Sequence, residues 1–226
     1  FFKGCPLDCV WCHNPESIST AIEIHWLENR CIGCGTCLQS CHIHALKRTE
    51  DGLQIDRNAC DLCGDCSRAC PANALEVLGK TSDIPSLVSE LEKDRSYYER
   101  SGGGITLSGG EPTLQPTFAL QTAAILHEKG YHVALDTCGL VSRTALEKFL
   151  PHVDLVLYDV KIMDSSEHLR WTGQDNRIIL DNLRWLIQWK DEHAGKPDLW
   201  IRTPLIPGAT DSEMNLVMIA NLINNE

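Results

Sequence analysis

The first chemically informative residues are three cysteines near the start of the chain, Cys5, Cys9 and Cys12. They are spaced by three and then two residues, on a loop that Gly4 and Pro6 open. Three thiolates can hold three irons of a 4Fe–4S cluster and leave the fourth iron without a protein ligand. An open coordination position distinguishes catalytic from structural metal sites. The spacing therefore predicts a catalytic cluster on this loop.

Zinc is the alternative metal for this loop, with His13 as the fourth donor after the three cysteines. Zinc motifs usually join two CxxC pairs that lie far apart in the sequence. This loop is instead one short run of three cysteines, so we favour iron.

Eight further cysteines form an internal repeat whose second copy begins 29 residues after the first. In each copy they are spaced by two, two and three residues, the run that holds a 4Fe–4S cluster in bacterial ferredoxins. In two-cluster ferredoxins the fourth cysteine of each run serves the other cluster. The expected ligand sets are therefore Cys31, Cys34, Cys37 and Cys70 for one cluster, and Cys60, Cys63, Cys66 and Cys41 for the other. Pro71 follows the second run as the ferredoxin pattern requires, whereas His42 follows the first.

Twelve cysteines in 226 residues could instead form the disulfide framework of a secreted protein. Eleven of them lie in tight clusters, whereas disulfides usually join distant segments, and an apolar content of 43% supports an ordinary core. No apolar signal segment is visible. We therefore expect reduced, metal-bound cysteines in the cytoplasm. Cys138, the twelfth, is expected to be a buried apolar thiol.

The net charge and the apolar pattern argue against two partners, nucleic acid and the membrane. A net charge of −11 argues against a nucleic-acid groove, which needs a basic stripe. No stretch approaches the roughly 20 apolar residues that span a membrane. Five isolated histidines are expected to be solvated rather than ligands: His127, His132, His152, His168 and His193.

The chain divides into three zones, at residues 1–24, 25–80 and 81–226. In the last zone, apolar runs that predict strands alternate with patterns that predict helices. The expected strands are 104–108, 132–137, 155–161 and 199–203, and the expected helices are 84–94, 116–129, 143–150 and 176–189. This alternation predicts an α/β fold with a parallel sheet. Residues 1–4 read as the tail of one more strand, so we expect an internal fragment with a partial barrel.

Several segments resemble one enzyme family. Residues 4–16, with the aromatic Trp11, resemble the CX3CXφC loop of radical S-adenosylmethionine (SAM) enzymes. Residues 102–112 resemble their GGE segment, and 134–137 and 157–161 complete a set typical of glycyl-radical-enzyme activating enzymes. The ferredoxin-like insert resembles the subgroup that activates choline, glycerol, arylacetate and related glycyl radical enzymes.

The resemblance implies a partial (β/α)6 radical SAM barrel with an inserted ferredoxin-like domain, and therefore three 4Fe–4S clusters. It implies an oxygen-sensitive, anaerobic oxidoreductase that cleaves SAM reductively to a 5′-deoxyadenosyl radical. That radical would take hydrogen from a backbone glycine of a partner glycyl radical enzyme, with flavodoxin or ferredoxin as external electron donor. The alternatives are a radical SAM maturase that modifies peptides, and a ferredoxin-like electron carrier fused to an unrelated α/β domain.

The resemblance also implies a set of SAM-binding residues. They are Trp11, Asn14, Gly109, Gly110, Glu111, Asp136, Thr137, Asp159, Lys161 and Arg202. Asp136, Thr137 and Asp159, with the backbone carbonyl of Leu157, would also form a monovalent-cation site beside the cofactor.

The residues themselves leave other interpretations open. Gly109 and Gly110 could form only a tight turn after a strand. Glu111 could be a surface charge where a helix begins. Asp159 and Lys161, two apart on an apolar strand and so on one face, could pair with each other or with Arg202.

Overall fold

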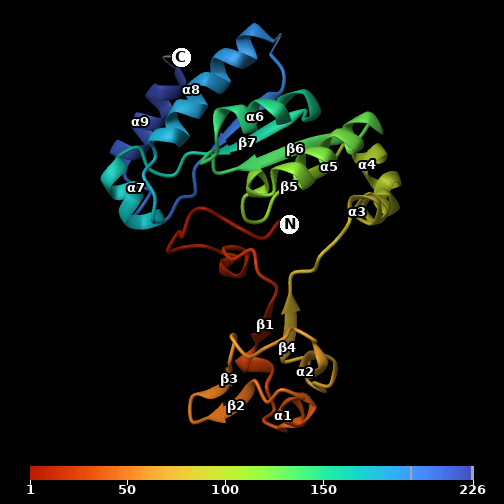
Figure 1. The fold of residues 1–226 in the computed structure, drawn as a ribbon. Helices are drawn as coiled ribbons and strands as arrows, with labels where there is room; N and C mark the ends of the chain where they lie inside the picture. The colour runs from red at the N-terminus through yellow and green to blue at the C-terminus, as the bar shows by residue number, and fades with distance from the viewer. Residues whose placement is uncertain (194, 225–226) are drawn as a thin grey trace. The chain divides into compact units, whose positions relative to one another are not determined.

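The computed structural model describes residues 1–193 and 195–224 and divides into two compact units. Unit 1 comprises Phe1–Thr20 and Ser82–Glu226, and unit 2 comprises Ala21–Thr81 (Figure 1). The expected first boundary, after residue 24, was four residues late. The reason is that β1 (Glu23–Trp26) pairs antiparallel with β4 (Leu75–Leu78) and so belongs to unit 2.

Unit 1 contains a four-stranded parallel sheet in the order β5-β6-β7-β8. The strands are β5 (Gly104–Leu107), β6 (His132–Thr137), β7 (Leu155–Asp159) and β8 (Asp198–Arg202). The strand tail before Cys5 lies beside this sheet, because Phe2 forms a parallel bridge with Gly109 and its N–H donates to the Ser108 carbonyl at 2.7 Å. The predicted parallel α/β sheet is therefore confirmed, and closure into a barrel stays a prediction.

Helices connect and cover these strands (Figure 1). The four expected helices are confirmed to within a few residues as α3 (Ile84–Leu91), α5 (Pro116–Glu128), α6 (Arg143–Phe149) and α8 (Arg177–Glu192). Two of them begin at a capping side chain, since Asp83 accepts from the Ser86 N–H and Ser142 from the Ala145 N–H. Three helices had not been expected: α4 (Arg95–Ser101), α7 (Ser165–Thr172) and α9 (Glu213–Asn224). Short 3-10 turns complete the unit: η1 (Pro15–Ser17), η3 (Glu92–Asp94), η4 (Pro112–Leu114) and η5 (Leu150–His152).

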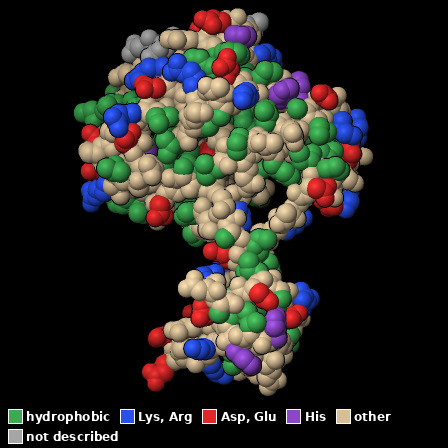
Figure 2. Space-filling model, in the orientation of Figure 1, with side chains coloured by type: hydrophobic (Ala, Val, Ile, Leu, Met, Phe, Trp, Pro, Cys, Tyr) green, Lys and Arg blue, Asp and Glu red, His purple; other side chains and the backbone are tan. Residues whose placement is uncertain are grey.

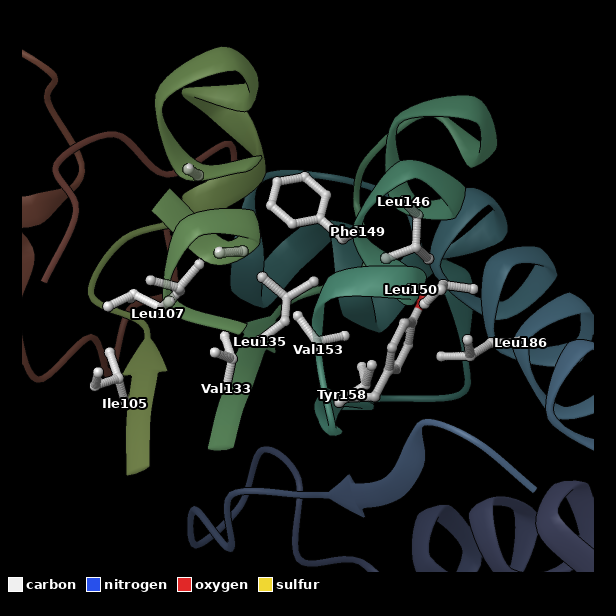
Figure 3. Packing of buried hydrophobic residues seen from close by; sticks show 14 of the residues in the cluster. Ile105, Leu107, Val133, Leu135, Leu146, Phe149, Leu150, Val153, Tyr158 and Leu186 are labelled. Atoms are coloured by element: carbon white, nitrogen blue, oxygen red, sulfur yellow. The ribbon is translucent and has the colours of Figure 1, made fainter. Parts of the chain in front are cut away.

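The core of unit 1 lies between the sheet and its covering helices. Val133 and Leu135 of β6 pack with Phe149 of α6, and Tyr158 of β7 lies close to Leu186 of α8 (Figure 3). All five are almost completely buried. Because burying such side chains stabilises the fold by about 1.5–3 kcal/mol each, this core holds the strand ends in fixed positions.

Unit 2 is built on the cysteine repeat. Besides β1 and β4 it contains η2 (Glu28–Arg30), α1 (Thr36–Ser40), the antiparallel pair β2 (Leu46–Thr49) and β3 (Gly52–Ile55), and α2 (Asp65–Arg68). The two copies match in detail. Gly35 and Gly64, which precede α1 and α2, both have a φ of 75°. Such regularity is expected of a repeat whose copies do equivalent work.

Charged side chains are mixed on the face of unit 1 shown in Figure 2, where Lys and Arg lie among Asp and Glu. Within the described residues, no helix combines the length and apolar character that crossing a membrane requires.

Candidate active site and cluster sites

The loop that carries Cys5, Cys9 and Cys12 belongs to unit 1, and all three thiols are half-buried. The Cys5 N–H donates to the Ile18 carbonyl at 3.0 Å, and the Cys12 N–H donates to the Cys9 carbonyl at 2.9 Å. The aromatic Trp11 lies 6.2 Å from the Trp171 ring, measured between ring centroids. Short backbone hydrogen bonds therefore give this loop a defined shape.

The separation of the sulfur atoms favours a cluster over a single zinc ion. With Zn–S bonds of about 2.3 Å, tetrahedral zinc holds its thiolates about 3.8 Å apart. Within the described ranges 1–193 and 195–224, one group of three potential ligands lies within 4.8 Å, and it consists of His42, Asp61 and Cys63. No three of Cys5, Cys9, Cys12 and His13 form such a group, so in any three of them at least one pair of donor atoms is more than 4.8 Å apart. The wider spacing suits a polynuclear cluster.

The thiols of the loop differ in acidity. The pKa of Cys5 is lowered to about 7, first because Cys138 donates a hydrogen bond to it. Burial raises the pKa of Cys9 to about 11, although the Lys161 ammonium acts in the opposite direction. Cys138 is buried, as expected, but its thiol is engaged with Cys5 rather than only packed in an apolar environment.

Four charged side chains form a network at the carboxyl ends of β6, β7 and β8. Lys161 Nζ donates to Asp159 Oδ2 at 2.9 Å, and Arg202 Nη2 donates to Asp159 Oδ1 at 2.9 Å and to Asp136. Ser108 Oγ donates to Asp136 Oδ2 at 2.8 Å. The pairing between Asp159, Lys161 and Arg202 that their positions suggested is therefore present.

Burial of Lys161 acts to lower its pKa, but the charge and hydrogen bond of Asp159 outweigh it and the net pKa is raised. Lys161 is thus a charged side chain in a nearly closed environment, with one carboxylate as its partner. A buried charge of this kind is favourable only where an anion faces it. The same ammonium also affects Cys5 and Cys9, which places it beside the cysteine loop.

Three of the four residues expected to bind a cation, Asp136, Leu157 and Asp159, lie close together. Asp136 and Leu157 are register partners between β6 and β7, and Asp159 lies at the end of β7. The Arg202 guanidinium bridges Asp136 and Asp159. A metal cation at this position would therefore share both carboxylates with Arg202. The Thr137 hydroxyl is directed elsewhere, because it donates to Glu111 Oε2 at 3.0 Å.

Glu111 is completely buried, so it is not the surface charge that its position could have indicated. Its Oε1 accepts from the Thr113 N–H and hydroxyl at 3.1 and 2.8 Å. Its Oε2 accepts from the Thr137 hydroxyl at 3.0 Å and from the Cys138 N–H at 2.7 Å. The carboxylate therefore ties the segment after β5 to the end of β6, and its contacts are those of a side chain that supports the site.

Replacing Glu111 with leucine is expected to lower the free energy of unfolding by about 3 kcal/mol or more, because several buried donors lose their acceptor. Anaerobic urea unfolding followed by circular dichroism measures this change. Glu147→Leu on the exposed surface of α6 is the matched control, with an expected change within about 0.5 kcal/mol. Equal losses in both variants would contradict the buried role.

Gly109 and Gly110 allow two backbones to approach closely. A Cβ on Gly109, which has a φ of 119°, would meet the Phe2 backbone at 2.5 Å, and one on Gly110 would meet the Gly4 carbonyl oxygen at 2.2 Å. The Gly110 N–H donates to the Phe2 carbonyl at 2.7 Å. These glycines therefore have a packing function, in addition to any contact with a cofactor. Asn14, in contrast, is exposed, and its side chain makes no capping hydrogen bond to η1.

In unit 2, cysteines from both copies of the repeat lie near one another. A small cavity in unit 2 is lined by thiols of both copies, namely Cys31, Cys34, Cys37 and Cys70. Burial raises the pKa of Cys66, and Cys60, Cys41 and Cys63 lie close enough for the charges of these thiols to raise it further. The fourth cysteine of each copy accepts an N–H from four residues later, Ala45 to Cys41 at 3.3 Å and Ala74 to Cys70 at 3.2 Å. These neighbours support crossed ligation, and the thiol donor sets fit 4Fe–4S clusters.

Two buried polar residues near the site were missed or misjudged from the sequence. His168, expected to be solvated, is 1% exposed, and Thr172 is completely buried. Burial lowers the pKa of His168, so the imidazole is neutral near pH 7. Both lie on α7, which contacts the cysteine loop.

The chain matches two family models. The model described as the radical SAM superfamily matches residues 63–218, more than half of the chain, and the model described as a 4Fe-4S dicluster domain matches residues 30–74. The first match agrees with the parallel α/β sheet, and the second with the repeat in unit 2.

Three curated relatives match almost the whole chain. The trans-4-hydroxy-L-proline dehydratase activating enzyme of Clostridioides difficile is 43% identical, over 96% of this chain and 70% of the relative. The choline trimethylamine-lyase activating enzyme of Oleidesulfovibrio alaskensis is 41% identical, over 96% and 69%. The isethionate sulfite-lyase activating enzyme of Nitratidesulfovibrio vulgaris is 41% identical, over 98% and 73%. The parallel sheet, the cysteine repeat and these relatives all indicate the same family. The chain belongs to the radical SAM superfamily and, within it, to the activating enzymes of glycyl radical enzymes.

Proposed function

We propose that this chain activates its partner enzyme with a 4Fe–4S cluster held by Cys5, Cys9 and Cys12. One observation carries the proposal: every strand of the parallel sheet ends in candidate residues, and the cysteine loop lies beside them, since the Glu111 N–H donates to the Gly4 carbonyl at 2.6 Å. Ligands of parallel α/β sheets bind at the carboxyl ends of the strands. Lys161, which acts electrostatically on Cys5 and Cys9, connects the two halves of this site.

Cys5, Cys9 and Cys12 would hold the cluster, which when reduced would supply the electron for cleavage of SAM to a 5′-deoxyadenosyl radical, and this radical would take hydrogen from a glycine of the partner. The protein's own side chains bind and orient the cofactor. Lys161 and Arg202 supply positive charge for its carboxylate and hydroxyl groups, and Asp136 and Asp159 hold these cations in place. Glu111 keeps the ends of β5 and β6 together.

We also propose that unit 2 carries two further clusters, in the crossed sets described above. Their ligands Cys31, Cys34 and Cys63 are exposed, so an external flavodoxin or ferredoxin can approach these clusters. Electron delivery is therefore the favoured role of unit 2. Because eleven thiols must stay reduced, we place the protein in the cytoplasm of an anaerobic cell.

The number of clusters is tested by metal analysis. After anaerobic reconstitution, the full-length protein is expected to hold about twelve irons per chain, four for each of three clusters. Chemical iron and sulfide determination gives this number, and zinc is measured alongside. About four irons, or stoichiometric zinc, would reject the three-cluster proposal.

The activase reaction is tested with a panel of glycyl radical enzymes. The relatives activate a hydroxyproline dehydratase, a choline lyase and an isethionate lyase at nearly equal identity, so the panel contains all three kinds. With reductant and SAM, and without oxygen, one of them is expected to develop a glycyl EPR doublet as 5′-deoxyadenosine forms. Efficient cleavage of SAM without a radical on any panel member, together with covalent change in a peptide, would favour the maturase alternative.

A further inference from the structure

The backbone of the cysteine loop is bound to the last turn of α7 at two points. The Asp8 N–H donates to the Thr172 carbonyl at 2.8 Å, and the Val10 N–H donates to the Trp171 carbonyl at 3.1 Å. A helix leaves its last four carbonyls without partners inside the helix. The loop supplies partners for two of them, and the two donors are the residues on either side of Cys9.

Side chains add a third contact between the loop and this turn. The rings of Trp11 and Trp171 lie 6.2 Å apart, with an interplanar angle of 43°. Trp171 is held by its own helix, because its Nε1 donates to Glu167 Oε2 at 3.1 Å and the Arg170 guanidinium lies 5.0 Å from the centre of its ring. The position of Trp11 therefore depends on where α7 ends.

His168 and Thr172 fix the shape of this last turn. The Gln174 carbonyl lies 2.7 Å from His168 Nδ1, and a carbonyl can only accept, so Nδ1 carries the proton. The Thr172 hydroxyl donates to the His168 carbonyl at 2.8 Å and lies 3.0 Å from Nδ1. Gly173, with a φ of 76°, then turns the chain away from the helix. The buried side chains of His168 and Thr172 thus determine the direction of the carbonyls that accept hydrogen bonds from the loop.

The same segment also carries the charged residues of the site. α7 starts after Asp164, three residues beyond Lys161. Asn176 Nδ2 donates to the Met163 carbonyl at 2.8 Å, and Asn215 Nδ2 donates to the Lys161 carbonyl at 3.0 Å. The link between β7 and α7 is therefore held by buried amides at both ends.

We propose that the last turn of α7, fixed by His168 and Thr172, positions the catalytic cysteine loop relative to Lys161 and Asp159. The proposal rests on the proposed function of that loop. His168 and Thr172 act through the backbone of the loop, so they are positioning residues. Misplacement of reacting groups by about 1 Å can cost about 100-fold in rate. A defined seat for the loop therefore contributes directly to SAM cleavage.

The test replaces Thr172 with valine, which keeps the shape of the side chain and removes its hydroxyl. The matched control is Thr122→Val on α5, because Thr122 is also completely buried and donates to the Phe118 carbonyl at 2.8 Å. Hydrogen exchange is measured on the anaerobically reconstituted protein. In Thr172→Val, amide exchange in the peptide containing Asp8 and Val10 is expected to be about fivefold to tenfold faster, and in the control it is unchanged.

Two further readouts separate positioning from general stability. In Thr172→Val, the KM for SAM is expected to rise, and the change that SAM causes in the EPR signal of the reduced cluster is expected to be altered. Thr172→Ser, which keeps the hydroxyl, restores both. If Thr172→Val does not fold, the pair His168→Leu and His168→Asn replaces it, since asparagine retains a donor near the position of Nδ1.

Equal exchange of the loop amides in Thr172→Val and Thr122→Val would overturn the inference, as would two His168 variants that both behave like the original protein. Failure of the proposed function has a different signature. In that case alanine at Cys5, Cys9 and Cys12 leaves SAM cleavage intact, whatever the exchange rates of the loop.

Discussion

A variant in which Cys5, Cys9 and Cys12 are all replaced by alanine is expected to lose reductive SAM cleavage completely while keeping about two thirds of its iron. The reason is that these thiols belong to unit 1, whereas the eight cysteines of the repeat belong to unit 2. The two ferredoxin-like clusters have their own ligands and should assemble unchanged. Iron analysis measures the retained iron, EPR of the reduced protein measures assembly of the two ferredoxin-like clusters, and detection of 5′-deoxyadenosine measures SAM cleavage.

The matched control for this variant is Cys138→Ala. Cys138 is a buried thiol that contacts Cys5, but it belongs to none of the three ligand sets. It is therefore expected to keep all of the iron, about twelve per chain. Unchanged SAM cleavage in the triple variant would show that the chemistry had been placed on the wrong cysteines. Loss of all iron would show that the units do not assemble independently.

The strands could be predicted from the sequence because they contain runs of consecutive apolar residues. The expected strand 132–137 is found with the same bounds, and the consecutive residues Val133, Ala134 and Leu135 within it are almost completely buried. The grouping of Cys31, Cys34 and Cys37 with Cys70 around one cavity could also be predicted, because the ferredoxin spacing indicates it directly. In both cases the signal lies in consecutive residues.

Helix α7 could not be predicted, because its buried residues are polar. His168 and Thr172 face the interior, whereas the apolar Leu169 is 53% exposed. The apolar periodicity on which helix prediction relies is therefore reversed. The partners of His168 and Thr172 are carbonyls that are placed by the tertiary fold, and no pattern in the sequence indicates them.

The orientation of the charged residues was also hidden. Glu111 could equally have been a surface charge, and its burial depends on donors from Thr137 and Cys138, which are 26 and 27 residues away. Arg202 bridges Asp136 and Asp159 because β6, β7 and β8 are neighbours in the sheet. Strand order is a property of the fold. The sequence therefore indicated which residues belong to this network more readily than which of them pair with one another.

The second large effect concerns the ligand sets of unit 2. Crossed ligation places Cys41 and Cys60 on one cluster, so replacing both with alanine is expected to damage that cluster only and to leave about eight irons. The structure supports this pairing, since Cys41 and Cys60 are both electrostatic neighbours of Cys66. EPR of the reduced protein then shows the remaining ferredoxin-like cluster with an unchanged signal.

The matched control replaces Cys31 and Cys41, which belong to the same copy of the repeat. Under crossed ligation these two thiols serve different clusters, because Cys31 shares its cavity with Cys70 of the other copy. The EPR signals of both ferredoxin-like clusters should therefore be lost or altered. Continued cleavage of SAM at the cluster of Cys5, Cys9 and Cys12 would show that unit 1 is still folded. Ligation within each copy predicts the reverse, with two damaged clusters in the Cys41 and Cys60 variant and one in the Cys31 and Cys41 variant. The two double variants remove the same number of thiols, so the difference between them reports which copies share a cluster.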